Sequence, residues 1–234
     1  MIHPNLIITT QTITMIANFK TMEEYLNVNG HPFLDWIKFL KSEAKNHLKV
    51  DLEISEHDII PIKSLLVYFD KDVEISNKMG IDLQKGIALL GPIGCGKTTL
   101  MRLFSRILTE EKNDSFIVKP TREIITEFDE AGRLIIQKYS KDLQLNGQRN
   151  YYTSLNYCFD DLGIENTLNH FGKKINVMEE ILTARYDIKH IKTHFTSNIN
   201  SAELKEKYGP RLASRMRQMF NTINFQINIK DKRK

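Results

Sequence analysis

The stretch Gly91-Pro-Ile-Gly-Cys-Gly-Lys-Thr-Thr99 decides the fold of this 234-residue chain. It matches the pattern G-x-x-x-x-G-K-T and follows the apolar run Ile87-Ala-Leu-Leu90, which has the composition of a buried strand. After it, apolar residues at positions 100, 103, 104, 107 and 108 recur with the period of an amphipathic helix. A strand, a glycine-rich loop and a helix in this order predict a phosphate-binding loop, rather than a simple turn between two elements.

The residue types in this stretch suit the phosphates of ATP. Loop N–H groups and the helix N-terminus favour anions, and glycine lets the backbone approach them closely. Lys97 is expected to reach the β- and γ-phosphates, and the Thr98 hydroxyl to bind Mg²⁺. ATP and Mg²⁺ are therefore the expected cofactors. The predicted cofactor-binding residues are Gly91, Pro92, Ile93, Gly94, Cys95, Gly96, Lys97, Thr98 and Thr99.

A second acidic motif, Tyr157-Cys-Phe-Asp-Asp-Leu-Gly163, is an apolar strand that ends in two acids. This is a Walker-B pattern. It predicts that Asp160 holds Mg²⁺ and that Asp161 polarises the attacking water or senses the γ-phosphate. The alternative is an Asx turn without a ligand. Because Asp161 stands where many ATPases have a longer Glu, slow hydrolysis is expected. Glu165 is a second candidate, although a solvated loop acid is the favoured interpretation.

The segment Thr193-His-Phe-Thr-Ser-Asn198 predicts another strand with a polar end. If this strand lies between the other two, Asn198 reaches both the γ-phosphate and the attacking water. The alternative is a turn into a helix that Asn200 and Glu203 cap. His190 and His194 stand four residues apart, but the strand pattern disfavours a metal site there.

Arg211 and Arg215 lie one helical turn apart in the segment Tyr208–Arg217. Two guanidinium groups on one helix face suit a phosphate presented by a neighbouring subunit, as an arginine finger does. Ordinary surface arginines are the commoner alternative. Together with the acids and the polar strand end, the predicted catalytic residues are Asp161, Asn198, Arg215 and Arg211.

Strand and helix patterns alternate along the chain. Helices are predicted at 20–50, after Pro61, at 121–139, at 175–187 and at 201–220. The last of them is expected to break at Gly209-Pro210. Strands are predicted at 87–90, 116–118, 157–159, 193–196 and 223–227. This order predicts an α/β fold with a mainly parallel sheet that binds ligands at the carboxyl ends of its strands. The predicted division is a helical N-terminal extension, 1–78, and an ATPase domain, 79–234.

Composition narrows the class of protein. The net charge is +4, with basic residues concentrated in the last 30 positions, which fits a phosphate-binding surface and a solvated helix face equally well. The chain has two cysteines, Cys95 and Cys158, expected as reduced thiols. No signal peptide or apolar run of membrane-spanning length is recognisable, so a soluble cytoplasmic protein without a membrane partner is expected.

The ordered motifs GPIGCGKTT, CFDDLG, ARY at 184–186, THFTSN and GPRLASRM resemble those of AAA+ ATPases. The resemblance is to the DnaC-type helicase loaders and the IstB-type transposition helpers, over about residues 80–227. It implies a three-layer αβα P-loop NTPase fold with strand order 5-1-4-3-2 and self-association with ATP between subunits. It further implies that Asn198 is sensor 1, Arg215 the arginine finger, Arg211 an assisting arginine, and Arg185 a conformational or interface arginine.

Two features depart from many AAA+ proteins. The sequence ends soon after the last predicted strand, without a C-terminal helical lid, as in the loaders, and the first 75 residues carry no Cys/His cluster. In the family such an extension grips a replicative helicase or a transposase; Phe33 and Trp36 are candidates, although a core role is favoured for both.

The resulting functional prediction is a helicase loader or remodelling helper in DNA replication or mobile-element DNA processing. Its ATP hydrolysis is expected to be slow and stimulated by a partner or by single-stranded DNA. One alternative is a non-hydrolysing, ATP-dependent binding module. Another is a small-molecule kinase, which leaves the paired acids and the downstream arginines without a role.

Overall fold

A five-stranded parallel sheet forms the centre of the computed structural model, which describes residues 27–28, 31–108, 115–141, 156–165, 168–170, 173–188, 191–226 and 231–232. The strands lie in the order β4-β5-β8-β3-β9. Their bounds are β3 Gly86–Leu90, β4 Phe116–Pro120, β5 Asn156–Asp160, β8 Thr193–Ser197 and β9 Phe220–Asn224. Renumbered along the chain, this order is 2-3-4-1-5, which is the predicted order 5-1-4-3-2 read from the opposite edge.

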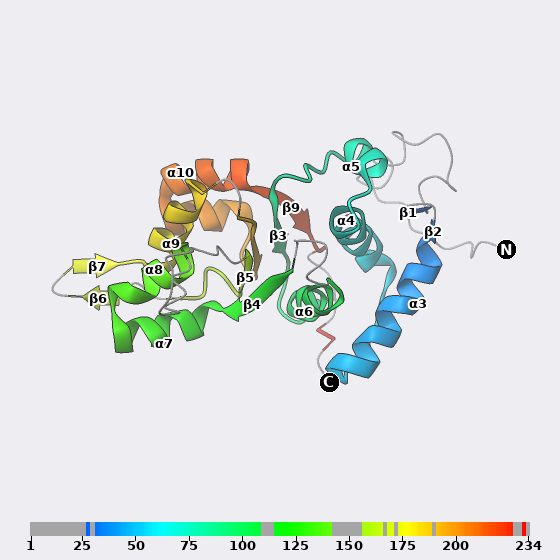
Figure 1. Ribbon diagram of the computed structural model, residues 1–234, viewed down its shortest axis with the longest axis horizontal. Helices are drawn as coiled ribbons and strands as arrows, with labels where there is room; N and C mark the ends of the chain where they lie inside the picture. The colour runs from blue at the N-terminus through cyan, green and yellow to red at the C-terminus, as the bar shows by residue number, and fades with distance from the viewer. Residues whose placement is uncertain are drawn as a thin grey trace, which may run out of the picture.

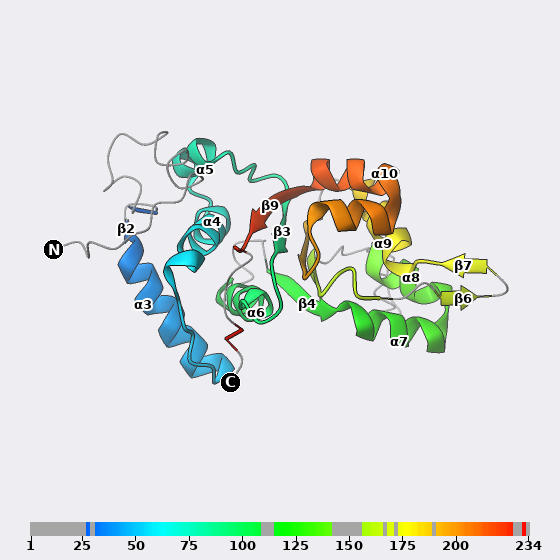
Figure 2. The ribbon, with the colours of Figure 1, turned by 180° about the vertical axis from the view of Figure 1, so that it is seen from behind.

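Helices cover both faces of the sheet, as Figures 1 and 2 show from opposite sides. One layer contains α3 Phe33–Glu43, α4 Ile59–Phe69, α5 Val73–Met79 and α6 Lys97–Ile107. The other contains α7 Thr121–Ala131, α8 Arg133–Lys141, α9 Val177–Tyr186 and α10 Ser201–Met219. The fold is therefore the three-layer αβα arrangement of a P-loop NTPase.

The continuous apolar run of β3 follows from its position between the two helical layers. Successive side chains of a strand point to opposite faces. Ile87 and Leu89 pack into the cluster formed with α3 to α6, whereas Ala88 and Leu90 pack into the cluster formed with α7 to α10. A strand buried on both faces has no polar face to show, which is why its sequence does not alternate.

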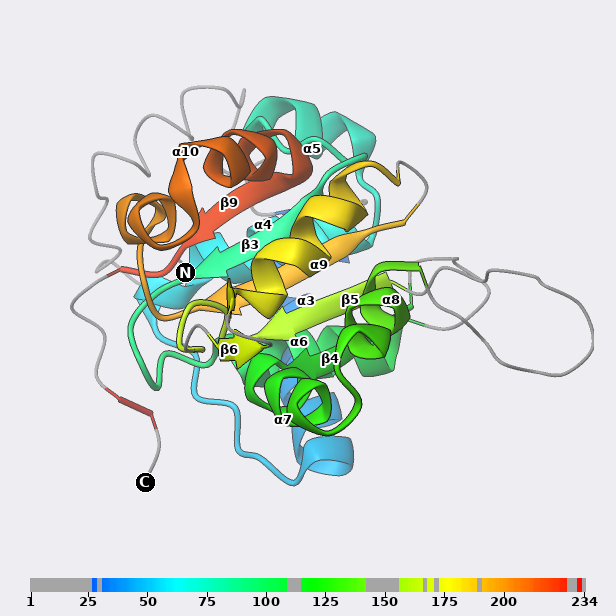
Figure 3. The same cartoon turned by 90° about the vertical axis from the view of Figure 1, so that its left-hand side faces the viewer.

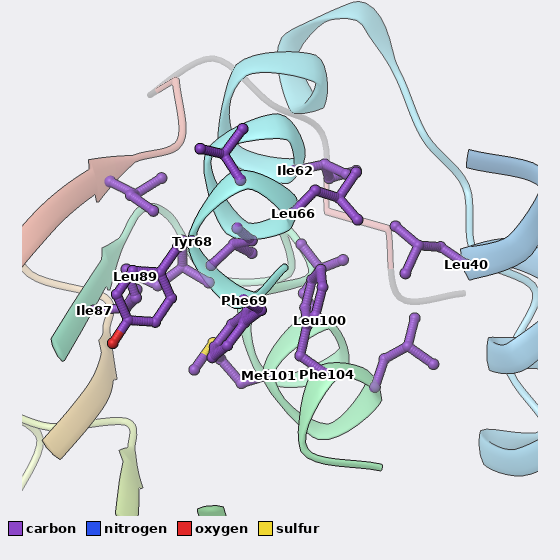
Figure 4. Packing of buried hydrophobic residues seen from close by; sticks show 14 of the residues in the cluster. Leu40, Ile62, Leu66, Tyr68, Phe69, Ile87, Leu89, Leu100, Met101 and Phe104 are labelled. Carbon is purple, nitrogen blue, oxygen red and sulfur yellow. The ribbon is translucent and has the colours of Figure 1, made fainter. Parts of the chain in front are cut away.

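The N-terminal helices pack into the same core as α6 and one face of the sheet (Figure 4). The Phe69 ring of α4 stacks on Phe104 of α6, with centroids 4.9 Å apart, and on Phe116 of β4 at 5.5 Å. Phe33 and Leu40 of α3 are buried in this cluster. The favoured core role of Phe33 is confirmed, and the domain boundary near residue 79 remains a prediction.

Several elements differ from the predicted ones. The predicted helix 121–139 is two helices, because Gly132, with φ 61° and ψ −139°, interrupts it. Within 20–50 the described helix begins at Phe33, and residues 1–26 lie outside the described chain. The last strand begins at Phe220, three residues earlier than predicted. The predicted break in the last helix is confirmed by Gly209, which has φ 78° and ψ 166°.

Short elements complete the described chain. They are β1 Asn27–Val28 paired with β2 His31–Pro32, the π-helical turn Ala44–Leu48, the 3-10 turn Glu56–Asp58, and β6 Leu168–His170 paired with β7 Lys173–Ile175. The β6–β7 hairpin had no sequence signal. In the described ranges, no helix is both long and apolar enough to cross a bilayer.

Candidate nucleotide site

The predicted phosphate loop joins the carboxyl end of β3 to the first turn of α6. Its backbone turns at Gly94, φ 78°, and at Gly96, φ 100°, which is the residue that precedes the helix. Both values lie in the left-handed region that glycine enters without steric cost. The loop therefore ends with the N–H groups of a helix N-terminus facing the position where phosphate would bind.

Lys97 lies inside this loop and is only 5% exposed. Its Nζ donates to the carbonyl oxygens of Gly91 and Pro92, each at 2.8 Å, and to Oδ1 of Asn198 at 2.9 Å. Burial lowers the pKa of Lys97, while Cys95 and the two neighbouring aspartates oppose that shift. The ammonium group is thus held between the loop and the end of β8.

Asp160 connects the phosphate loop to the end of β5. Its Oδ1 accepts hydrogen bonds from Thr98 Oγ1 at 2.8 Å and from Thr196 Oγ1 at 2.7 Å. The residue is buried, whereas Thr98 is half-buried. A carboxylate in this position would be costly to bury without such donors. The contact brings together the two residues that were predicted to bind Mg²⁺.

Asp161 lies next to Asp160 in a tight turn with φ 58°. Its backbone N–H donates to Thr196 Oγ1 at 2.9 Å, and its carbonyl accepts from Thr121 Oγ1 at 3.0 Å. Its carboxylate Oδ1 accepts from Asn198 Nδ2 at 3.1 Å. These contacts fix an unusual backbone conformation and aim the side chain toward Asn198.

Thr196 and Thr121 hold this arrangement, and sequence analysis did not single them out. Thr196 bonds both aspartates through one hydroxyl group, as acceptor from one and donor to the other. Thr196 belongs to a strand, Thr193–Ser197, that is buried along its whole length, and a buried hydroxyl needs partners. Nothing in the sequence around Thr121 indicated its contact.

The residues at this edge fit Mg²⁺ shared with a phosphate. Mg²⁺ in proteins is usually held by one or two oxygen ligands together with phosphate oxygens and water. Thr98 and Asp160 supply such oxygens side by side. In the part of the chain that the structure describes, no group of three or more His, Cys, Asp or Glu side chains is placed to hold a metal ion by itself.

The expectation that Glu165 is a solvated loop acid is wrong. It is 5% exposed, and its carboxylate accepts from the Gly163 N–H at 2.8 Å and from the Tyr208 hydroxyl. Burial, followed by the Glu165 charge and hydrogen bond, raises the pKa of Tyr208. Glu165 thus anchors the loop after β5 to α10.

Arg185, for which the resemblance implied a conformational or interface role, lies in the interior of this chain. It is 3% exposed, its Nε donates to Thr193 Oγ1 at 2.7 Å, and its Nη1 donates to the Tyr139 carbonyl at 2.8 Å. Its guanidinium also lies over the rings of Tyr157 and Phe159. A side chain held in this way braces the interior and does not offer its charge to a neighbouring subunit.

Arg211 and Arg215 lie away from the phosphate loop. They line a cavity of about 350 Å³ between α9 and α10, and no residue of Gly91–Thr99 lines it. Arg211 is exposed, and the Arg215 guanidinium lies 4.9 Å from the centroid of the Tyr186 ring. Within one chain the structure therefore does not bring these arginines to the site that contains Lys97.

His194 is a core residue. Its ring packs between Phe69 and Phe116, and its Nδ1 accepts the Ile87 N–H at 3.1 Å. Burial, aided by the charges of Lys192 and Arg185, lowers its pKa to about 3. His190 lies outside the described residues.

Comparison with known proteins gives short sequence matches. No family model matches the chain. The phosphate import ATP-binding protein PstB of Pseudoalteromonas translucida is 36% identical over 70 residues, 28% of this chain and 25% of that protein. The proteasome-activating nucleotidase of Thermococcus onnurineus is 39% identical over 66 residues, 28% of this chain and 16% of that protein. The chain spans a quarter or less of these curated relatives.

Solved structures match this chain over most of its length. A crystal structure of DnaI has 20% sequence identity and a TM-score of 0.51, over 77% of this chain and 90% of that chain. A crystal structure of the DnaC helicase loader has 19% identity and a TM-score of 0.48, over 70% and 89%. The likeness to DnaI shows a shared fold, in agreement with the parallel sheet and phosphate loop described above.

Proposed function

We propose that this chain binds ATP with Mg²⁺ at the carboxyl edge of its sheet and hydrolyses it slowly, as an AAA+ ATPase that loads or remodels a DNA-processing protein. One observation carries the proposal. Lys97 and Thr98 begin α6 directly after the phosphate loop, and Asp160, Asp161 and Asn198 lie at the ends of β5 and β8. Asn198 bonds both Lys97 and Asp161, and Thr98 bonds Asp160. The Thr196 hydroxyl joins the two sets, because it donates to Asp160 and accepts the Asp161 N–H. Open α/β sheets bind ligands at this edge.

Each side chain has a role that its position allows. Lys97 exchanges its contacts with the loop carbonyls for the β- and γ-phosphates, and Thr98 with Asp160 holds Mg²⁺. Bound Mg²⁺ supplies charge neutralisation for the transferred phosphoryl group. Asp161 accepts a proton from the attacking water or orients that water. Asn198 orients the side chains of Asp161 and Lys97 through its two hydrogen bonds. Because these groups are already oriented, little rearrangement is needed in the transition state.

The client of the ATPase is proposed from the motif set that resembles helicase loaders and transposition helpers. A replicative helicase is the favoured client and a transposase the alternative, with self-association and contact with single-stranded DNA as further proposals. The N-terminal helices are the proposed client-binding part. The shared fold with DnaI is compatible with this assignment and does not identify the client.

Lys97→Ala tests the proposal directly. The loss of a charged contact to the phosphates is expected to weaken ATP binding by several kcal/mol, about 100-fold or more in Kd. Binding is measured by titration with a fluorescent ATP analogue and Mg²⁺. Lys205→Ala, at an exposed position of α10, is the matched charge control and is expected to bind like the parent. Unchanged affinity in Lys97→Ala overturns the assignment of this loop.

Turnover separates the proposal from a non-hydrolysing module. Phosphate release is measured with and without single-stranded DNA, under conditions where ATP binding is saturated. Slow release that DNA or a purified helicase stimulates supports the ATPase. Saturated binding without release above the Lys97→Ala background supports the binding module.

A further inference from the structure

Strand β9 forms one edge of the central sheet, and in the described part of the chain a strand pairs with only one of its sides. The Phe225 N–H donates to the Leu90 carbonyl oxygen at 2.7 Å, so residues 221, 223 and 225 direct their backbone groups toward β3. Because these groups alternate along a strand, those of Thr222 and Asn224 point away from β3. Both residues are exposed. Figure 3 shows β9 at the edge of the sheet, beside α10.

The opposite edge of the sheet carries residues that discourage pairing with another chain. Strand β4 contains Lys119 and Pro120. A charged side chain and a proline are common devices that keep an edge strand from accepting a further strand. Strand β9, with the sequence FNTIN, has neither a charge nor a proline. Of the two edges, β9 is therefore the one suited to pair with another strand.

Two hollows border β9, one on each face of the sheet. The larger, about 280 Å³, lies between α10 and the sheet and is lined mainly by apolar side chains, among them Phe195 and Phe220. The smaller, about 150 Å³, lies beside α4 and includes Ile60 and Ile81. Thr222 lines both. Since successive side chains of a strand point to opposite faces, a strand added to β9 would place its side chains alternately at the two hollows.

The charges beside the larger hollow indicate what binds there. Lys205 and Arg217 of α10 are the charged residues that line it, and both are exposed. Among the described residues, neither has an acid as an ion-pair partner. They complement carboxylates on the α10 face, where a strand presents every second residue. A matching segment therefore has an apolar residue with an acid two positions before it and another two positions after it. A second copy of β9 would instead bring its own Lys205 and Arg217 to the same place.

We propose that the outer edge of β9 is a docking site for an extended, acidic segment of a partner protein, which adds to the sheet as a sixth strand. Its backbone pairs with Thr222 and Asn224, its apolar side chain enters the larger hollow, and its carboxylates meet Lys205 and Arg217. Strand addition obtains affinity from main-chain hydrogen bonds and specificity from pockets for alternate side chains. The site is separate from the nucleotide site, since no residue of Gly91–Thr99 lines either hollow.

A labelled peptide, Thr-Glu-Val-Leu-Val-Glu-Thr, tests the charge pattern, and the same peptide with Lys in place of Glu is its matched control. Fluorescence anisotropy with the parent chain should show about tenfold or tighter binding of the acidic peptide. Lys205→Glu combined with Arg217→Glu should reverse this preference. Lys41→Glu combined with Arg102→Glu, at exposed positions of α3 and α6, should keep it. Equal binding of the two peptides, an unreversed preference, or no binding at about 1 mM overturns the proposal.

Methylation of the peptide backbone distinguishes strand addition from binding through side chains alone. N-methyl groups on alternate residues remove either the amides that face β9 or the amides that face away from it. One series should bind about tenfold or more weakly, and the other should stay within about threefold, because only one side of an added strand bonds to the edge. Similar affinities for the two series contradict strand addition.

Amide hydrogen exchange, followed by NMR, shows what covers the edge. In the free chain, the amides of Thr222 and Asn224 should exchange fast and that of Phe225, which bonds to β3, slowly. The acidic peptide should protect Thr222 and Asn224. Protection in the free chain at every concentration means that another segment of this chain covers the edge, and protection that grows with concentration means that a second copy does. Either result overturns a partner site, and neither bears on the nucleotide site, which the Lys97→Ala titration tests.

Discussion

Asn198 donates a hydrogen bond through Nδ2 to Oδ1 of Asp161, over 3.1 Å. Its other amide atom, Oδ1, accepts from Lys97 Nζ at 2.9 Å. A lysine can only donate and a carboxylate can only accept, so these two neighbours fix the orientation of the amide. The relationship depends on topology, because β8 lies between β3, which leads to Lys97, and β5, which leads to Asp161.

The first prediction concerns Asn198→Ala. ATP affinity is expected to stay within a few-fold of the parent, since the loop and Mg²⁺ ligands are untouched. Turnover should fall by about tenfold to 1,000-fold, because Asp161 and the Lys97 ammonium lose the group that orients them. Single-turnover hydrolysis, measured beside a binding titration, separates the two effects. Asn46→Ala, at an exposed site, is the control, and parent-like turnover in Asn198→Ala excludes a sensor role.

The second prediction separates the paired aspartates. Asp160→Asn should weaken Mg²⁺-dependent nucleotide binding, because the carboxylate next to Thr98 is lost. Asp161→Asn should bind ATP like the parent and hydrolyse it about 100-fold or more slowly, because only Asp161 acts on the water. Binding titrations at several Mg²⁺ concentrations and single-turnover rates distinguish the two variants.

Glu165→Gln is the control for this pair. Its carboxylate is tied to Gly163 and Tyr208, so the substitution is expected to lower the melting temperature and leave the chemical step near its parent rate. Parent-like turnover in Asp161→Asn, together with loss of turnover in a stably folded Glu165→Gln, means that Glu165 is the acid that acts on the water.

The site was predictable where its signals are local. The glycine pattern and the acids at the end of β5 each follow an apolar run, and Asn198 follows the short strand β8. The order of strands and helices then puts them at one edge. The interior position of Arg185 and the burial of Glu165 depend on contacts with distant elements. The clearest case is the Lys232–Asp58 pair, whose members are 174 positions apart and lack any shared pattern. Long-range packing of this kind leaves no periodic signal in a single sequence.

The third prediction follows from the buried ring of His194. Its pKa is lowered to about 3, mainly by burial, whereas the unfolded chain titrates near 6.5. Between these values the unfolded state binds the extra proton, so stability is present above about pH 6.5 and is lost as the pH falls toward 3. The expected slope is at most about 1.4 kcal/mol per pH unit. Urea unfolding between pH 7.5 and 4.5 measures it.

His194→Asn removes this titration and keeps an acceptor for the Ile87 N–H. The variant is expected to be less stable at neutral pH and to lose less stability on acidification. His57→Asn, which replaces an exposed histidine, is the control and should retain the slope of the parent. Identical pH slopes in His194→Asn and the parent mean that His194 is not the group responsible.

The fourth prediction concerns Arg215, which packs on Tyr186 away from the phosphate loop of its own chain. If Arg215 completes the site of a neighbouring subunit, Arg215→Ala should bind ATP with near-parent affinity. Its turnover should nevertheless fall by on the order of 10³-fold or more, as when other trans arginines are removed. Arg217→Ala, an exposed arginine of the same helix, is the control for the loss of one positive charge.

Mixed oligomers decide whether Arg215 acts in trans. Arg215→Ala subunits have an intact nucleotide site, and Lys97→Ala subunits retain the arginine but are expected not to bind ATP. Neither variant alone should hydrolyse ATP, whereas their mixture should recover turnover, because an intact site then meets an intact arginine across an interface. The mixture is measured with single-stranded DNA present, and differently tagged subunits are co-purified to show that mixed oligomers form.

If mixed oligomers form and turnover stays at the level of the separate variants, Arg215 does not act across an interface. The loss in Arg215→Ala then has to arise within the chain, through its contact with Tyr186 and the packing of α10 on α9.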